Sequence, residues 1–311
     1  MAGATGVLGR RLVGRLVANG HTVVGLARTP EKERLVKSLG GIPARADLFD
    51  AKSLASAMAG TEVAIRTATS IPTKTRLKPE DFHTNDRIRT QGTRAMIEAA
   101  ARVGARGYVH ESIVWAVRSS DGSPYGEEAT PNPQSYLRAT LEGERIARQT
   151  GEQLGMDVAI LRCGLFYAPD AAHTRTMGER LMKGTLPIVG NGQTTGSLAH
   201  ADDAAAAFVA ASESQRGGLW HVVDNRPVTL EELFTEFARR LGARSPRRVP
   251  PWLAKLAAGS LSVEILLTSF PTSSIRFQRE TGWRPKYPTF REGLDQIVGA
   301  WKSEGFPGLG R

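Results

Sequence analysis

The sequence contains a single cysteine in 311 residues, no long apolar run and little chain before its first glycine. One cysteine, Cys163, excludes an internal disulfide, and this is typical of a protein kept in the reducing cytoplasm. Its position within the apolar run 158–166 predicts a buried, unreactive thiol. Since no segment approaches the roughly 18 apolar residues of a membrane helix and no basic-then-apolar leader is visible, we predict no membrane partner.

The formal charge is strongly basic, +10 at pH 7. Arginine is spread along the chain with a mild cluster at 239–248, and basic residues do not alternate with aromatic ones as they do in single-strand-binding proteins. We therefore predict no nucleic-acid partner, and we interpret the charge as favouring an anionic small-molecule ligand.

Short apolar runs alternate with helical patterns through the first two-thirds of the chain. This order predicts an α/β fold with a Rossmann-like doubly wound parallel sheet. Strands are expected at 22–27, 42–48, 62–68, 108–112, 158–166 and 219–223, and helices at 8–17, 50–58, 85–103, 136–154, 177–187, 199–211, 229–241 and from 289. We predict a dinucleotide-binding domain at 1–168 and mainly a small C-terminal substrate lobe at 169–311, with some later segments returning to the first domain.

Glycines at positions 3, 6 and 9 form a GxxGxxG loop that is followed at once by an amphipathic helix. Glycine lets the backbone turn tightly and approach a pyrophosphate, and the helix N-terminus supplies N–H donors. The loop residues assigned to cofactor binding are Gly3, Thr5, Gly6, Val7, Leu8 and Gly9. Because Met1 and Ala2 alone precede the loop, we expect the first strand to be largely missing and the natural chain to start roughly five to seven residues earlier.

The choice of cofactor depends on the end of the second strand. An acidic residue there binds the ribose 2′-hydroxyl of NAD, whereas an arginine can pair with the 2′-phosphate of NADP. Arg28 stands at this position and no acid follows until Glu31, which predicts that NADP(H) is preferred over NAD(H). Asp47 and Leu48, after the third strand, are expected near the adenine.

These features resemble the extended short-chain dehydrogenases, also called the NAD-dependent epimerase/dehydratase family. The resemblance runs from the glycine loop to about Gly293 and is carried by GATGVLGRRLV, GHTVVGLAR, RTATSIP, NDRIRTQGTRAMIEAA, YVHESIVW, LRCGLFYAPD, GNGQTTGSLAHADDAAAAFVAA and LWHVVDNRPVTLEEL. It implies that the loop Thr67, Ala68 and Thr69 lies beneath the pyrophosphate, that Asn85 begins the next helix, and that Cys163 lies in the segment covering the nicotinamide. The helices 85–103 and 136–154 resemble the pair that forms dimers in this family, which implies a possible homodimer.

The family's catalytic residues are a serine or threonine and a Tyr-x-x-x-Lys pair, and the resemblance places them at Ser112, Tyr136 and Thr140. The family's lysine contacts the nicotinamide ribose and lowers the tyrosine pKa, which is ordinarily near 10. Thr140 could hydrogen-bond the ribose but carries no charge, and no lysine lies between Lys78 and Lys183. Ser112 is expected to hydrogen-bond the reacting oxygen and Tyr136 to exchange the proton weakly; alternatively, Tyr136 caps the pocket or another residue does the chemistry.

The sequence therefore predicts an NAD(P)-dependent oxidoreductase or epimerase-like enzyme acting on a carbonyl or alcohol of a small molecule or sugar nucleotide. The alternative is a non-catalytic NADP(H)-binding sensor of the same fold, which the missing lysine favours. No metal is expected, because His200, Asp202 and Asp203 are better explained as residues at a helix start, where acids favour the helix dipole.

Overall fold

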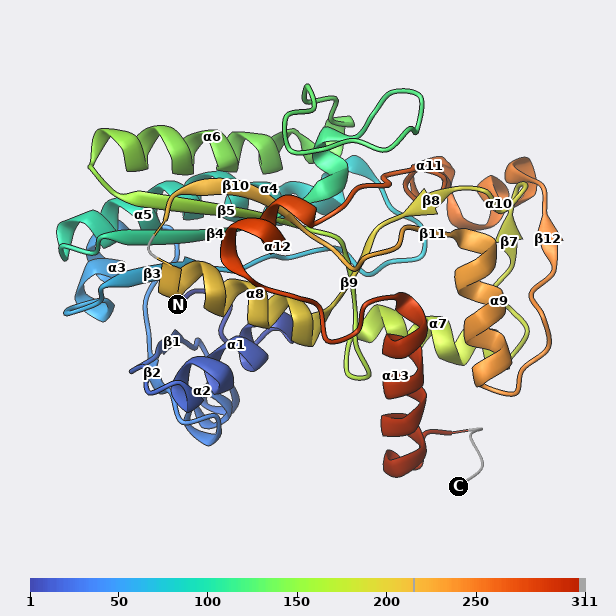
Figure 1. Cartoon of the computed structure of the whole chain (residues 1–311), viewed down its shortest axis with the longest axis horizontal. Coiled ribbons are helices and arrows are strands. Elements are labelled where there is room, and N and C mark those ends of the chain that lie inside the picture. Colours follow the sequence, from blue (N-terminus) through green and yellow to red (C-terminus); the bar gives the residue numbers. More distant parts are fainter. Residues whose placement is uncertain (215, 308–311) are drawn as a thin grey trace.

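A parallel sheet with helices on both faces forms the centre of the molecule (Figure 1). The computed structural model describes residues 1–214 and 216–307. The main sheet has the order β10-β5-β4-β3. Its strands are β3 (Val63–Arg66), β4 (Gly107–Ile113), β5 (Asp157–Cys163) and β10 (Gly218–Val222). A second parallel pair consists of β1 (Val24–Leu26) and β2 (Ile42–Ala44), and the predicted Rossmann-like doubly wound fold is confirmed.

Two residues, Met1 and Ala2, occupy the place of the strand that joins these two sets. Ala2 forms a single parallel bridge with Arg66, and its N–H donates to the Ile65 carbonyl at 2.9 Å. On the other side the Leu26 N–H donates to the Met1 carbonyl at 2.9 Å. The sheet is therefore continuous across this point, but over a width of two residues, as expected from the shortened first strand.

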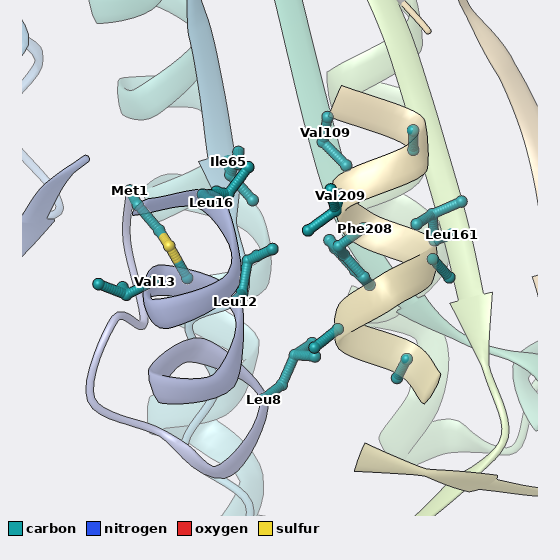
Figure 2. Packing of buried hydrophobic residues seen from close by; sticks show 14 of the residues in the cluster. Met1, Leu8, Leu12, Val13, Leu16, Ile65, Val109, Leu161, Phe208 and Val209 are labelled. Carbon is teal, nitrogen blue, oxygen red and sulfur yellow. The ribbon is translucent and has the colours of Figure 1, made fainter. Parts of the chain in front are cut away.

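The two faces of the sheet are covered by different helices. α3 (Ala51–Ala57), α5 (Thr93–Arg102) and α6 (Arg138–Gln153) cover one face, and α1 (Val7–Ala18) and α8 (Ala201–Ser214) cover the other (Figure 1). Figure 2 shows Leu8 and Leu12 of α1 pointing toward Phe208 and Val209 of α8. Packing against α8 thus fixes the helix that carries the glycine loop.

A second apolar core lies beside the sheet and holds the C-terminal lobe. It is built by α7 (Ala172–Met182), α9 (Leu230–Arg240) and α13 (Phe290–Glu304), with Phe237 and Trp301 fully buried. The remaining elements are α2 (Pro30–Ser38), α4 (His83–Arg87), β6 (Leu165–Tyr167), β7 (Ile188–Val189), β8 (Thr195–Gly196), β9 (Leu198–His200), β11 (Val228–Thr229), β12 (Arg248–Val249), α10 (Pro251–Ala258), α11 (Ser260–Leu266) and α12 (Ile275–Thr281). α8, β10 and α12 pack with the sheet, so the chain returns to the first core after residue 168; the boundary there stays a prediction.

The long helix predicted at 85–103 is interrupted. α4 leads into a π-helical turn, Ile88–Gly92, before α5 begins. The Thr93 hydroxyl donates to the Arg89 carbonyl at 2.6 Å, and a Cβ on Gly143 of α6 would lie 2.4 Å from that same carbonyl oxygen. Direct packing of α6 on the wide turn accounts for a break that the apolar spacing does not reveal.

The strand expected at 158–166 is divided into β5 and β6, of which β6 pairs with β9 outside the main sheet, and further elements differ in their bounds. The strand expected at 42–48 ends at Ala44, and the helix expected at 177–187 runs over Ala172–Met182 because Gly184, at φ +65°, follows its end. The helix expected at 199–211 starts at Ala201, since Leu198–His200 pairs with β6 as a strand. An apolar segment as short as this fits a strand or a helix equally well, and the pairing partner decides.

Two helices begin with the sequence pattern of a capping box, and the one at Thr289 and Glu292 is complete. At Thr229 the hydroxyl accepts from the Glu232 N–H at 3.2 Å. The Glu232 carboxylate turns away to Arg291, so this box is half formed. No helix in the described part of the chain is both long and apolar enough to cross a bilayer.

The contact between Gly143 and the π-helical turn gives a stability prediction. Gly143→Ala places a methyl group against backbone rather than against a flexible side chain, so we expect the free energy of unfolding to fall by about 2 kcal/mol. Gly14→Ala within α1 is the control, because a Cβ there meets no atom within 4 Å and alanine stabilises a helix interior by roughly 0.5–1 kcal/mol. Urea unfolding of both variants measures the difference, and equal stabilities would contradict it.

Candidate cofactor and active site

The glycine loop is closely packed against the end of β3. Gly3 has φ +89°, and a Cβ on it would lie 2.6 Å from the backbone carbon of Thr67. A Cβ on Gly9 would lie 1.9 Å from the Gly3 carbonyl oxygen. Gly6, the N-cap of α1, is exposed and its N–H donates to that oxygen at 3.1 Å. The loop therefore requires glycine at positions 3 and 9 for steric reasons.

The first turn of α1 offers free donors beside this loop. Arg10 is the first residue of the helix whose N–H reaches a carbonyl, that of Gly6 at 3.0 Å. Among the described residues, the N–H groups of Val7, Leu8 and Gly9 have no hydrogen-bond acceptor, and this turn contains no acidic residue. Unpaired N–H groups at the positive end of a helix dipole are what a pyrophosphate binds. The residues present thus fit a dinucleotide.

The side chains of the loop mostly face the protein. Leu8 is buried in the core between α1 and α8 (Figure 2). Val7 packs against a small apolar cluster that includes Ala168 and Ala201. Thr5 is half-buried. The cofactor role predicted for Val7 and Leu8 therefore depends on their backbone.

The residues assigned to the adenosine end follow β1 and β2, which are neighbouring parallel strands. Arg28 is exposed, and no described residue forms an ion pair or hydrogen bond with its side chain. Asp47 is also exposed, and one of its carboxylate oxygens accepts from the Phe49 N–H at 2.9 Å. Leu48 lies against Gly92 at the π-helical turn. Arg28 is thus available for an anionic ligand.

The loop after β3 is held from both sides. The Thr67 hydroxyl donates to the Ala2 carbonyl at 3.1 Å, and Ala68 is half-buried. Thr69 is exposed, and the next residue, Ser70, donates its N–H to the buried Asn85 side chain at 3.1 Å. These contacts fix the loop next to Gly3, where the resemblance places the pyrophosphate.

Cys163, at the end of β5, is completely buried. Its Sγ lies 3.7 Å from the Leu161 carbonyl, and burial raises the pKa of the thiol well above its usual value. The expectation of a buried thiol is confirmed.

Tyr136 lies just before α6 in an apolar setting. Its ring packs on Phe82 with centroids 5.1 Å apart, and its hydroxyl donates to the Gln134 side chain at 2.7 Å. Burial raises the pKa of Tyr136, the Glu264 carboxylate raises it further, and the Arg118 guanidinium opposes them. The side chain is therefore a protonated phenol at neutral pH.

Ser112 is completely buried, and its hydroxyl faces a buried carboxylate. It donates to Glu144 of α6 at 2.5 Å, and Glu144 forms a bidentate pair with Arg162 of β5 at 2.9 and 2.7 Å. The next residue, Ile113, belongs to the same apolar cluster as Tyr136. The structure thus joins Ser112 to Glu144, and none of the described hydrogen bonds joins it to Tyr136.

Thr140 is 2% exposed on α6, between the Tyr136 and Glu144 turns. No positive charge stands at this position, as the sequence indicated.

Sequence reasoning missed Arg118 and Gln134, which approach Tyr136 from the segment 114–135, where no periodic pattern exists to place them. It also missed Arg89, Glu111 and Glu144, whose burial beneath the sheet edge no local pattern reveals.

His200, Asp202 and Asp203 each have a partner in the fold. His200 Nε2 lies 3.2 Å from the Gln296 side-chain oxygen, and Asp202 forms an ion pair with Arg11 at 2.5 Å. Asp203 accepts the N–H groups of residues 286 and 287 at 2.8 and 3.0 Å. Their polar atoms connect α8 to α1 and to the C-terminal segment.

Comparison with known proteins identifies the family. The model of the family described as "NAD dependent epimerase/dehydratase family" matches residues 1–222. A 3-diazoavenalumate denitrifying reductase from a Streptomyces species is 34% identical, covering 94% of this chain and 98% of the relative. A UDP-glucose 4-epimerase from Mycolicibacterium smegmatis is 28% identical, covering 96% of each chain.

A solved structure has the same fold. The dTDP-glucose 4,6-dehydratase from Streptomyces venezuelae, solved with NAD bound, superposes with a TM-score of 0.81 at 21% identity, covering 99% of this chain and 98% of its own. These three proteins are named as enzymes, which lends no support to a non-catalytic sensor. The chain belongs to the NAD dependent epimerase/dehydratase family.

Proposed function

We propose that this chain is an NAD(P)-dependent oxidoreductase that interconverts a carbonyl and an alcohol on a small molecule. The observation that carries the proposal is the glycine loop, with three free N–H groups at the start of α1, in a chain whose named relatives include a reductase. When bound, the nicotinamide cofactor supplies or accepts the hydride. The protein's own residues position the two reactants and handle the proton.

NADP(H) is the preferred cofactor in this proposal. Arg28 is exposed at the end of β1 and no described carboxylate neutralises it. A guanidinium can pair with a 2′-phosphate through two hydrogen bonds, which a ribose hydroxyl cannot match.

Arg28→Ala tests the cofactor preference. We expect the Kd for NADPH to rise about tenfold, because a charge-assisted hydrogen bond to the 2′-phosphate is lost. The Kd for NADH should stay within about twofold. Arg34→Ala, which removes an exposed charge from the following helix, is the matched control. Fluorescence titration with both cofactors measures the effect, and a parallel loss for NADH and NADPH would refute the assignment.

Tyr136 acts as a general acid in the direction of carbonyl reduction. Because burial raises its pKa, the phenol keeps its proton at neutral pH and has one to give. Oxidation of an alcohol needs the phenolate instead. Thr140 carries no positive charge that would stabilise the phenolate. Ser112 orients α6 through Glu144 in this scheme, and Thr140 offers a hydroxyl to the cofactor ribose.

The proton role of Tyr136 predicts a pH dependence. The reductive kcat should stay level up to about pH 9, because the phenol remains protonated, and the oxidative rate should rise with pH. Tyr136→Phe should lower the reductive kcat by about 100-fold while leaving the NADPH Kd unchanged. Stopped-flow rates across pH measure both, and a reductive rate that falls near pH 7 would exclude Tyr136 as the acid.

Thr140→Lys tests whether the tyrosine site is intact but unassisted. A lysine one turn from Tyr136 lowers the cost of forming the phenolate, so we expect the oxidative rate to increase about tenfold. Thr140→Met, which adds bulk without charge, is the control. Equal rates in both variants would mean that Tyr136 does not exchange the proton.

The surroundings of Tyr136 favour a substrate with an apolar body. Its cluster contains Phe82 and Ile113, with Trp115 and two side chains of α11, Leu261 and Ile265, packed against it. A sugar nucleotide needs several polar partners, and beside these apolar side chains the polar groups that act on Tyr136 are Gln134, Glu264 and Arg118. The sugar-nucleotide alternative rests on the epimerase relative.

We also propose a cytoplasmic homodimer. The location rests on the single free cysteine, and the dimer on the likeness of α5 and α6 to the helix pair that associates in this family. Light scattering of the purified protein measures the oligomeric state.

A further inference from the structure

Two buried arginines lie near one buried glutamate at the carboxyl ends of β3 and β4. Arg66, the last residue of β3, is 0% exposed, and Arg89, in the π-helical turn, is 1% exposed. Glu111 of β4 is 3% exposed and lies 3.5 Å from Arg89 Nη2. Two cations and one anion leave a net positive charge in the interior, an arrangement that costs free energy unless another group compensates it.

The arginines differ in how far their hydrogen bonds are satisfied. Arg66 donates from Nη1 to the Glu111 carbonyl at 3.4 Å and from Nη2 to the Ile88 carbonyl at 3.3 Å, and its Nε has no hydrogen-bond partner among the described residues. Arg89 has an ion pair with Glu111 and no hydrogen-bond partner for Nε or Nη1 among the described residues. A buried donor without an acceptor is rare in folded proteins.

The neighbouring pair of Arg162 and Glu144 shows what a structural ion pair looks like in this chain. It is bidentate, at 2.9 and 2.7 Å, and the carboxylate also accepts the Ser112 hydroxyl. Both side chains are buried as deeply as those of Arg89 and Glu111. Burial alone therefore does not explain the open geometry at Arg89.

The position of Arg89 relates it to the cofactor. Arg66 is followed directly by Thr67, which touches Gly3 of the phosphate loop. Beside burial, which raises the pKa of the Cys163 thiol at the end of β5, the Glu111 charge raises this pKa further and the Arg89 charge lowers it. The glycine loop and the ends of β3 and β5 are the parts of the fold assigned to the dinucleotide. The incompletely bonded Arg89 guanidinium therefore lies near the proposed cofactor site.

We infer that Arg89 is a cofactor-positioning residue whose free N–H groups bind the nicotinamide ribose, supplying from the π-helical turn the cation that α6 lacks at Thr140. This inference rests on the proposed function. Arg66 cannot take the role, because both of its terminal nitrogens already donate to carbonyls. Glu111 holds the Arg89 guanidinium in place by its charge.

The burial of Arg89 indicates how binding proceeds. The residue is 1% exposed, so a ligand reaches the guanidinium after a local movement. The π-helical turn Ile88–Gly92 is where we expect this movement, because π-helical turns are frequent at functional sites. Cofactor binding should then slow amide exchange in this turn.

Arg89→Met tests the inference on the full chain. It removes the ion pair with Glu111 but leaves the buried Arg66 cation near that glutamate, so the Tm of the cofactor-free protein should fall by less than in a variant without such a second cation, while the NADPH Kd should rise at least tenfold. Arg89→Lys, which keeps the charge, should recover most of the affinity. Arg162→Met is the matched control: it strands the buried Glu144 carboxylate, so it should lower the Tm.

Thermal unfolding, fluorescence titration and hydrogen exchange at Ile88–Gly92 provide the readouts. An unchanged NADPH Kd in Arg89→Met would overturn the inference, as would a fall in Tm as large as that of Arg162→Met, which would make Arg89 structural. Failure of the unsubstituted chain to bind either dinucleotide would instead defeat the proposed function, so the two failures are distinguishable.

Discussion

The close approach of Gly3 to Thr67 is the contact on which the arrangement of the site depends. It brings the turn before α1 against the end of β3, and a side chain at Gly3 would collide with backbone. Once this approach is made, α1 must leave the sheet edge with its first N–H groups exposed to a ligand. Its apolar face then meets α8, which the chain supplies almost two hundred residues later (Figure 2).

The buried charged side chains near the carboxyl ends of the strands differ in how completely they are paired. The Arg162–Glu144 pair is complete and joins β5 to α6, and the cost of taking both charges out of water is offset by short, bidentate hydrogen bonds. The Arg66–Arg89–Glu111 group has the same burial with poorer bonding. Strained or incompletely bonded groups are concentrated at functional sites because the rest of the fold can hold them there. The contrast between two ion pairs of the same residue types within one sheet is more informative than either pair alone.

Much of the fold follows from the sequence, because it depends on local patterns. The apolar face of α1 and the caps at Asp50 and Thr289 each act over a few residues, and these helices form where the sequence predicts helices. The interruption of the helix at Ile88–Gly92 and the choice of strand for Leu198–His200 depend on α6 and β6, which are distant in sequence. The candidate site divides in the same way. The glycine loop and Arg28 could be located from spacing, whereas Arg89, Arg118 and Glu144 could not, since burial and pairing become visible in three dimensions.

The separate pairing of β1 and β2 has a consequence for cooperativity. These two strands and α2 form a lateral unit that is not part of the four-stranded main sheet, and this unit carries Arg28 after β1. A lateral unit of this kind can open by itself at a lower free energy than the whole domain. A dinucleotide that spans from the glycine loop to Arg28 would connect the unit to the main sheet. Binding of the ligand would then stabilise this unit against local unfolding. The affinity for the adenosine half of the dinucleotide and the free energy of opening the unit would be thermodynamically linked.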